Sequence, residues 1–261
     1  MKIRYYVADA FTDRPFHGNP AGVCLLEKAI DDETMQNIAF ENNLSETAFL
    51  VRKAAGQYNL RWFTPEAEID LCGHATLASA FILSEFFGET DTVKYDTMSG
   101  ILSTVRRDGA FYLDFPATPP KKAGDIVSVA AALGEMPDEL YLSRDLMAVY
   151  RYETQILRIK PDFEKLGALD RGFGVIVTAP GEKVDFVSRF FAIKAGIGED
   201  PVTGSSHTTL IPYWSKRLSK DSLVAQQLSQ RGGRLLCKNA GERVVIGGKA
   251  VLYSKGEIFC D

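Results

Sequence analysis

Histidine and cysteine are scarce in this 261-residue chain, and their scarcity argues against a metal site. The three histidines are widely spaced, and the four cysteines show no metal-ligand spacing. No apolar run approaches the length of a membrane span, and the first residues carry no secretory hydrophobic region. No basic block suits a nucleic acid, and the net charge is −4. We therefore expect a cytoplasmic protein with reduced thiols and no metal, membrane or nucleic-acid partner.

Two common catalytic signatures are also missing. The chain has no Gly-x-Ser-x-Gly elbow, which a serine hydrolase would need. No glycine-rich phosphate fingerprint follows a predicted strand. These absences disfavour a serine hydrolase and an enzyme that binds phosphate through a glycine-rich loop.

Two stretches without fixed charge predict buried helices. Each follows an acidic residue and opens with a glycine, Gly73 after Asp70 and Gly204 after Asp200. No side chain carries a fixed charge in residues 74–84 or 204–215, and a helix that is uncharged all round belongs inside a protein. The N-terminus of such a helix presents unpaired N–H groups and a partial positive charge, which together attract an anion.

Three pairs of glycines recur at nearly the same offset, in repeating local contexts. They are Gly73 and Gly204 (204 − 73 = 131), Gly100 and Gly233 (233 − 100 = 133), and Gly109 and Gly241 (241 − 109 = 132). Offsets close to half the chain indicate an internal duplication more than a coincidence among 22 glycines.

A proline-rich segment at residues 116–122 marks the expected domain boundary. We predict two α+β domains, residues 1–116 and 117–261, each a curled sheet around one buried helix, with the last strand free to pack on the first domain. Within the second half, residues 146–159 read as a strand and residues 222–229 as a helix. If the two buried helices begin at the domain cleft, their N-termini would share one small-molecule pocket.

Five motifs, in order along the chain, resemble the PhzF-like family of phenazine biosynthesis. They are DAF at residues 9–11, GNPA at 18–21, NLSETAF at 43–49, DLCGHAT at 70–76 and EDPVTGS at 199–205. The resemblance continues to about residue 233, so it covers most of the chain. It implies a diaminopimelate epimerase-like fold of two similar domains with a site between them, a cofactor-free isomerase activity and a homodimer.

The resemblance also implies the residues of the site. It places Glu46 as the catalytic acid and base, where a lone glutamate would otherwise be read as a surface carboxylate. A carboxyl group shielded from water can take and return a proton near neutral pH. A purely structural role is the alternative for three of these residues. His74 would then only begin a helix, Asp200 would cap a turn, and Asn19 would form part of a plain turn. The implied substrate-binding residues are Asn19, Gly73, His74, Asp200 and Ser205.

Cys72 and His207 are the residues whose roles the motifs leave open. Cys72 resembles the first of the two catalytic cysteines of the epimerases, but residues 200–205 hold no second one, which favours a small buried residue. His207 lies two residues after Ser205 and adds a histidine near the expected pocket, so the motifs do not identify the substrate. We expect an isomerase of a small carboxylate, such as a cyclic amino or hydroxy acid. The alternatives are a non-catalytic member that binds a small molecule or a protein on the same fold, and a racemase that uses Cys72.

Overall fold

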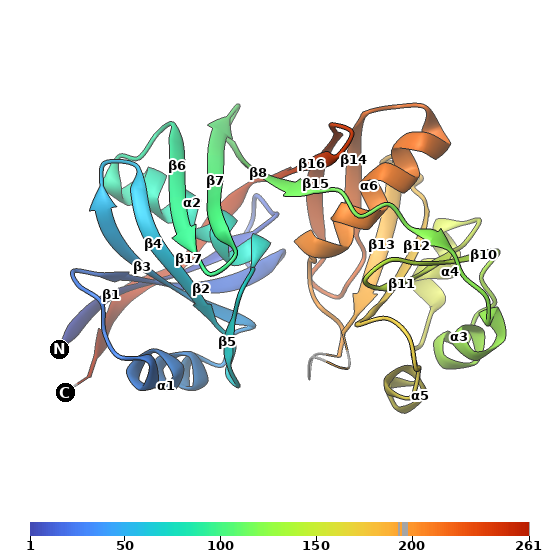
Figure 1. The fold of residues 1–261 in the computed structure, drawn as a ribbon, viewed down its shortest axis with the longest axis horizontal. Helices are drawn as coiled ribbons and strands as arrows, with labels where there is room; N and C mark the ends of the chain where they lie inside the picture. The colour runs from blue at the N-terminus through green and yellow to red at the C-terminus, as the bar shows by residue number, and fades with distance from the viewer. Residues whose placement is uncertain (193, 195–197, 261) are drawn as a thin grey trace. The chain divides into compact units, whose positions relative to one another are not determined.

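The structure is a computed structural model that describes residues 1–192, 194 and 198–260, and the chain divides into two compact units (Figure 1). The first unit comprises Met1–Asp114 and the C-terminal segment from Gly247, and the second comprises Phe115–Ile246. No helix in the described part of the chain combines the length and apolar character that crossing a bilayer demands.

The first unit is a curled mixed sheet around one helix. Its strands pair in the order β17-β1-β2-β3-β4-β6-β7-β8, with the short β5 against the end of β4. The helix α2 (Gly73–Phe87) packs on strands from both ends of that order, including β17 and β7, so the sheet wraps around it. The remaining elements are β1 (Lys2–Ala10), β2 (Asn19–Leu26), α1 (Asp32–Asn42), β3 (Glu46–Ala54), β4 (Gln57–Phe63), β5 (Glu68–Ile69), β6 (Thr92–Thr97), β7 (Gly100–Arg107), β8 (Ala110–Pro116) and β17 (Ala250–Phe259).

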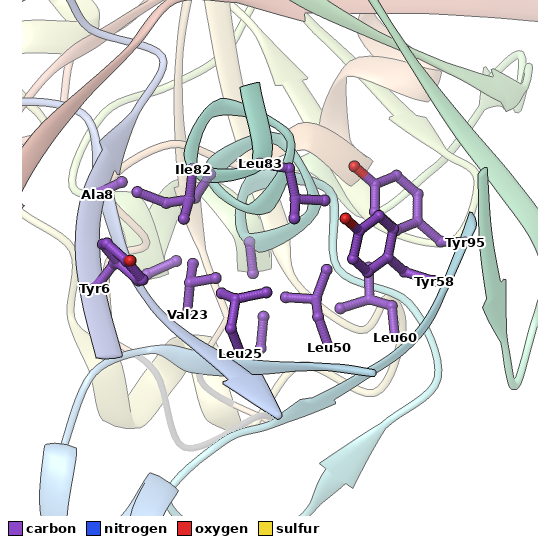
Figure 2. Close-up of a cluster of buried hydrophobic side chains, with 14 of the residues drawn as sticks. Tyr6, Ala8, Val23, Leu25, Leu50, Tyr58, Leu60, Ile82, Leu83 and Tyr95 are labelled. Atoms are coloured by element: carbon purple, nitrogen blue, oxygen red, sulfur yellow. The ribbon is translucent and has the colours of Figure 1, made fainter. Parts of the chain in front are cut away.

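The core of this unit forms because alternate strand residues face α2. Figure 2 shows Leu50 of β3 and Leu60 of β4 pointing toward Ile82 and Leu83 of the helix. The intervening residues face the other side of the sheet, where Phe49 packs in a separate cluster with the buried face of α1. This period of two is the ordinary consequence of strand geometry.

The second unit has the same kind of sheet. Its strands pair in the order β9-β10-β11-β12-β13-β14-β15. The helix α6 (Gly204–Leu218) packs on β14 and β15, and its Trp214 donates a hydrogen bond from Nε1 to Thr178 of β12. The elements are β9 (Lys121–Lys122), α3 (Ile126–Leu133), β10 (Glu139–Leu142), β11 (Leu146–Val149), α4 (Glu153–Arg158), α5 (Phe163–Gly167), β12 (Val175–Pro180), β13 (Phe186–Phe191), β14 (Ser222–Gln227), β15 (Gly233–Asn239) and β16 (Arg243–Gly248).

The two units repeat one topology, which agrees with the expected duplication. In the first, the pairings along β1-β2-β3-β4-β6-β7 run antiparallel, parallel, antiparallel, parallel, antiparallel. The pairings along β10-β11-β12-β13-β14-β15 have the same directions. The recurring glycines occupy matching places: they begin α2 and α6, they begin β7 and β15, and they form the turns that follow those two strands with positive φ. The predicted α+β, epimerase-like class of fold is therefore confirmed.

Two local predictions in the second half are wrong. Residues 222–229 were expected as a helix, but Ser222–Gln227 is the strand β14, because pairing with β13 and β15 overrides the helix propensity of its residues. Residues 146–159 were expected as one strand, but only Leu146–Val149 is extended and Glu153–Arg158 is helical. The missed signal is Gln155, whose side chain accepts the backbone N–H of Tyr152 as in a capping box.

Pro212 lies inside α6 without ending it. A proline has no N–H to offer the carbonyl four residues earlier, here that of Thr208. The N–H of Thr118, in the segment after β8, donates to that carbonyl at 3.0 Å. The helix is therefore continuous to Leu218.

His207 is part of this unit's core. Its Nδ1 lies 2.7 Å from the carbonyl oxygen of Thr203, which can only accept, so the neutral ring carries its proton on Nδ1. Its Nε2 is buried and has no hydrogen-bond partner among the described residues, and its ring lies 5.9 Å from that of Phe186. Burial lowers the pKa of His207 to about 4, against the opposing effect of the bond to Thr203. His207 is therefore a neutral structural histidine at physiological pH.

The burial of His207 makes the folded protein less stable in acid. The pKa of His207 is about 4 in the folded state and ordinarily 6.5, so the unfolded chain binds more protons between these values and the free energy of unfolding falls as the pH drops. The difference amounts to about 3 kcal/mol between pH 7 and pH 4. We expect His207→Asn, whose amide can still donate to Thr203, to remove that part of the pH dependence in urea unfolding. His17→Asn, at the partly exposed histidine, is the control; equal pH dependence in His207→Asn and the wild type would contradict the assignment.

Candidate functional site

Three polar side chains meet where β3 and α2 begin. Glu46 is the first residue of β3, Cys72 is the N-cap residue of α2 and His74 is the second residue of that helix. All three are buried, with 7%, 6% and 6% of their surfaces exposed. One ligand atom from each lies within 4.8 Å of the others. The fold thus joins two motifs that lie nearly thirty residues apart (74 − 46 = 28).

The ring of His74 lies between the carboxylate and the thiol. Its Nε2 is 3.0 Å from Oε2 of Glu46, and its Nδ1 is 3.5 Å from Sγ of Cys72. Although Nε2 and Oε2 are close, they are not aligned as a hydrogen bond, and neither has another partner among the described residues. Buried polar atoms are usually satisfied. These two are therefore available to a third group.

The charges of the cluster are set by burial and by one another. Burial lowers the pKa of His74, but the neighbouring Cys72 and Glu46 outweigh it, so the net pKa of His74 is raised well above its ordinary value. Burial, followed by the negative charge of Glu46, raises the pKa of the Cys72 thiol, against the opposing influence of His74. Burial thus disfavours the charged thiolate of Cys72, whereas the neighbouring Cys72 and Glu46 favour the charged ring of His74.

The start of α2 adds backbone donors to this region. No side-chain hydrogen bond caps the N-cap position, although the N–H of Ala75 lies close enough to the Cys72 thiol to lower its pKa; Gly73 supplies the first N–H group of the helix. The hydroxyl of Thr76 donates back to the Cys72 carbonyl. Asn19 is fully buried at the first position of β2, two residues before Ala21, the register partner of Glu46.

The other two predicted residues lie in the second unit. Asp200 accepts a hydrogen bond from the hydroxyl of Thr203, the N-cap residue of α6. The buried side chain of Gln227 holds this turn, since its amide donates to the Asp200 carbonyl at 2.8 Å and its oxygen accepts the Thr203 N–H at 2.9 Å. The turn is thus ordered by its own contacts, and the carboxylate of Asp200 is half-buried.

Ser205 has a cationic neighbour. Nη2 of Arg144 donates to Oγ of Ser205 at 3.2 Å, and the guanidinium lies 5.0 Å from the ring centre of Phe173. Arg144 therefore brings a positive charge to the first turn of α6, where the helix already presents the positive end of its dipole. This pairing suits a carboxylate.

Sequence reasoning missed Gln227 and Arg144. Gln227 was predicted to lie in a helix, where a glutamine gives no sign of a buried role. The available clue was the alternation of a strand, which puts Gln227 on the same buried face as Leu223 and Ala225. Arg144 precedes Ser205 by 61 residues, and nothing in the local sequence links the two. The structure brings Glu46, Gly73 and His74 together in the first unit, and Asp200 and Ser205 lie at the start of α6 in the second.

Comparison with known proteins relates the whole chain to one family. A family model described as phenazine biosynthesis-like protein matches residues 8–256. An uncharacterized isomerase of Pseudomonas aeruginosa is 49% identical over 260 residues, which is 99% of each chain. The crystal structure of a PhzF-family protein of Enterococcus faecalis is 51% identical, with a TM-score of 0.97 over the full length of both chains.

A more distant structure extends the likeness of fold alone. A hydroxyproline epimerase of Agrobacterium vitis aligns with 98% of this chain and 92% of its own at a TM-score of 0.63 and 11% identity. The match of the family model over nearly the whole chain, together with relatives near 50% identity, places this chain in the phenazine biosynthesis-like (PhzF) family.

Proposed function

We propose that the protein is a cofactor-independent isomerase that moves a proton between two carbons of a small carboxylate metabolite, with Glu46 as acid and base. The observation that carries the proposal is the buried Oε2 of Glu46, 3.0 Å from Nε2 of His74 and outside any aligned hydrogen bond. The relatives of Pseudomonas aeruginosa and Halalkalibacterium halodurans named as uncharacterized isomerases, at 49% and 43% identity, support the reaction class.

A single carboxyl group suffices for this reaction. Glu46 removes a proton from one carbon and returns it to another, so no second acid is required. His74 stabilises the carboxylate before the proton is taken, and the loss of that stabilisation afterwards favours return of the proton to the substrate. Glu46 holds the transferred proton for a time, and a proton that exchanges with solvent during that time leaves deuterium on carbon when the reaction runs in deuterium oxide.

The start of α6 in the second unit carries groups suited to binding a carboxylate. Ser205, Arg144 and the N–H groups at the start of α6 combine a hydroxyl, a positive charge and backbone donors. In this proposal Asp200 receives a polar or amino group of the substrate, and Gln227 is a positioning residue that orders the turn bearing Asp200.

Two rival functions make different demands on the same residues. A protein that only binds a ligand needs no proton transfer by Glu46. A thiol-dependent racemase needs Cys72 as a thiolate, but burial raises the pKa of that thiol, and residues 200–205 contain no partner cysteine. Both observations favour the carboxylate mechanism.

The first test is isotope exchange with Glu46→Gln. With a panel of cyclic amino and hydroxy acids in deuterium oxide, the wild type should place deuterium on a carbon of recovered substrate or product. The variant keeps the size and hydrogen bonding of the side chain but cannot take a proton. It should lose the roughly 10²–10⁴-fold that acid/base catalysis supplies while binding the ligand nearly as well. Mass spectrometry measures the label.

Glu66→Gln is the matched control, because this exposed glutamate lies in the same unit. It should label substrate at the wild-type rate. Turnover by Glu46→Gln at that same rate would refute the role of Glu46, and a ligand that binds without any labelling would favour the binding protein.

Cys72→Ser separates the carboxylate from the thiol mechanism. A serine hydroxyl can still meet Nδ1 of His74 but cannot act as a thiolate. We expect labelling to stay within about tenfold of the wild type, whereas a thiol base would lose the roughly 10²–10⁴-fold of acid/base catalysis. Circular dichroism of the variant establishes that the fold is intact, so a loss of the larger size would reinstate the racemase.

A further inference from the structure

We infer that Glu46, Cys72 and His74 form a binding site for a zinc-type divalent ion, whose occupancy competes with proton transfer at Glu46. The site is a cluster of one carboxylate, one thiol and one imidazole, with one ligand atom from each residue within 4.8 Å of the others. This goes beyond the proposed isomerase, because the site can bind an ion whether or not the protein turns over a substrate.

The donor set selects the kind of ion. Thiolate and imidazole are ligands for zinc, cobalt and other first-row transition metals, while calcium and magnesium prefer oxygen alone. Three protein ligands with a fourth position open to water are the usual shell of a reactive zinc ion. Cys72, His74 and Glu46 supply that number.

The distances are compatible with a tetrahedral shell after a small adjustment. Zinc bonds of 2.0–2.3 Å place the ligand atoms about 3.3–3.6 Å apart. In the structure, His74 lies 3.0 Å from Glu46 and 3.5 Å from Cys72. Because the thiol and the carboxylate contact opposite nitrogens of the ring, sharing one ion requires one of them to approach the other nitrogen by roughly 1 Å, from within 4.8 Å.

Two of the donor atoms lack a hydrogen-bond partner, which is a separate sign of a ligand. Oε2 of Glu46 and Nε2 of His74 are both buried, contact each other at 3.0 Å without hydrogen-bond alignment, and have no aligned hydrogen bond among the described residues. Unsatisfied buried polar atoms are costly, and each would be satisfied by coordination to an ion.

The charges balance in the bound state. The divalent ion binds the carboxylate of Glu46, the thiolate of Cys72 and the neutral ring of His74, so the buried site carries no net charge. The thiol proton and any proton on the ring pass to the buffer as the ion binds. The bound ion holds the oxygen of Glu46 that proton transfer requires, so it acts as an inhibitor of the isomerase and not as its cofactor.

Cobalt provides a direct probe, since a Co²⁺–thiolate bond gives a near-ultraviolet charge-transfer band. The full-length protein, freed of metal with a chelator, is titrated with Co²⁺ at neutral pH and then with Zn²⁺. We expect one cobalt per chain, a thiolate band, and loss of that band as zinc displaces cobalt. Cys72→Ser should abolish the band and weaken cobalt binding at least tenfold. Changes to residues that only support a metal ligand already cost about tenfold or more in affinity, so the loss of a ligand should cost no less.

Cys237→Ser is the matched control, because Cys237 is a buried free cysteine of the second unit. It should keep both the band and the affinity. Glu46→Gln provides a second variant, which should keep the thiolate band but bind cobalt at least tenfold more weakly. Absence of a band in the wild type, or an equal band in Cys72→Ser, would overturn the site. Neither result bears on labelling by Glu46, so failure here is distinct from failure of the isomerase.

Discussion

Packing of a helix that carries no fixed charge before its last turn against a curled sheet, carried out twice, is the constraint on which this structure depends. α2 and α6 are each fifteen residues long, and most of their side chains face strands instead of water. Such a helix needs strands packed against it, because its apolar and uncharged side chains have to be covered from water. The matching order of parallel and antiparallel pairings in the two units is the shared solution to this packing problem.

The same constraint creates the chemistry at the helix starts. A helix that enters the core brings its first N–H groups with it, and those groups need partners that a hydrophobic core does not offer. Small polar residues fill the first turns, and their hydroxyls bond back to the preceding turn, as Thr76 does with Cys72 and Ser206 with Thr203. What remains is a polar end of a helix in a region of low dielectric, where charges interact strongly.

The pair of Glu46 and His74 is difficult to explain as a contribution to stability. Removing two charges from water costs several kcal/mol for each ion, and a buried pair recovers that cost only with good geometry and further hydrogen bonds. Here the facing atoms are close but misaligned, and they have no other partner among the described residues. A buried pair of charged groups that does not favour folding, and whose facing atoms can still bind another group, is typical of a functional site.

The sequence by itself determined the elements whose signals are local. The absence of charge in residues 74–84 and 204–215 identified both buried helices, and glycine spacing revealed the repeat. The resemblance of the motifs to the PhzF-like family made Glu46 the candidate acid/base residue. Only the tertiary structure decided contacts between distant segments: the ring of His74 between a carboxylate and a thiol, and the guanidinium of Arg144 on Ser205. It also made residues 222–227 a strand, since the neighbours that impose extended pairing lie far away in the chain. Local pattern records which face of a segment is apolar, whereas the partner that covers that face is set by the folding of the whole chain.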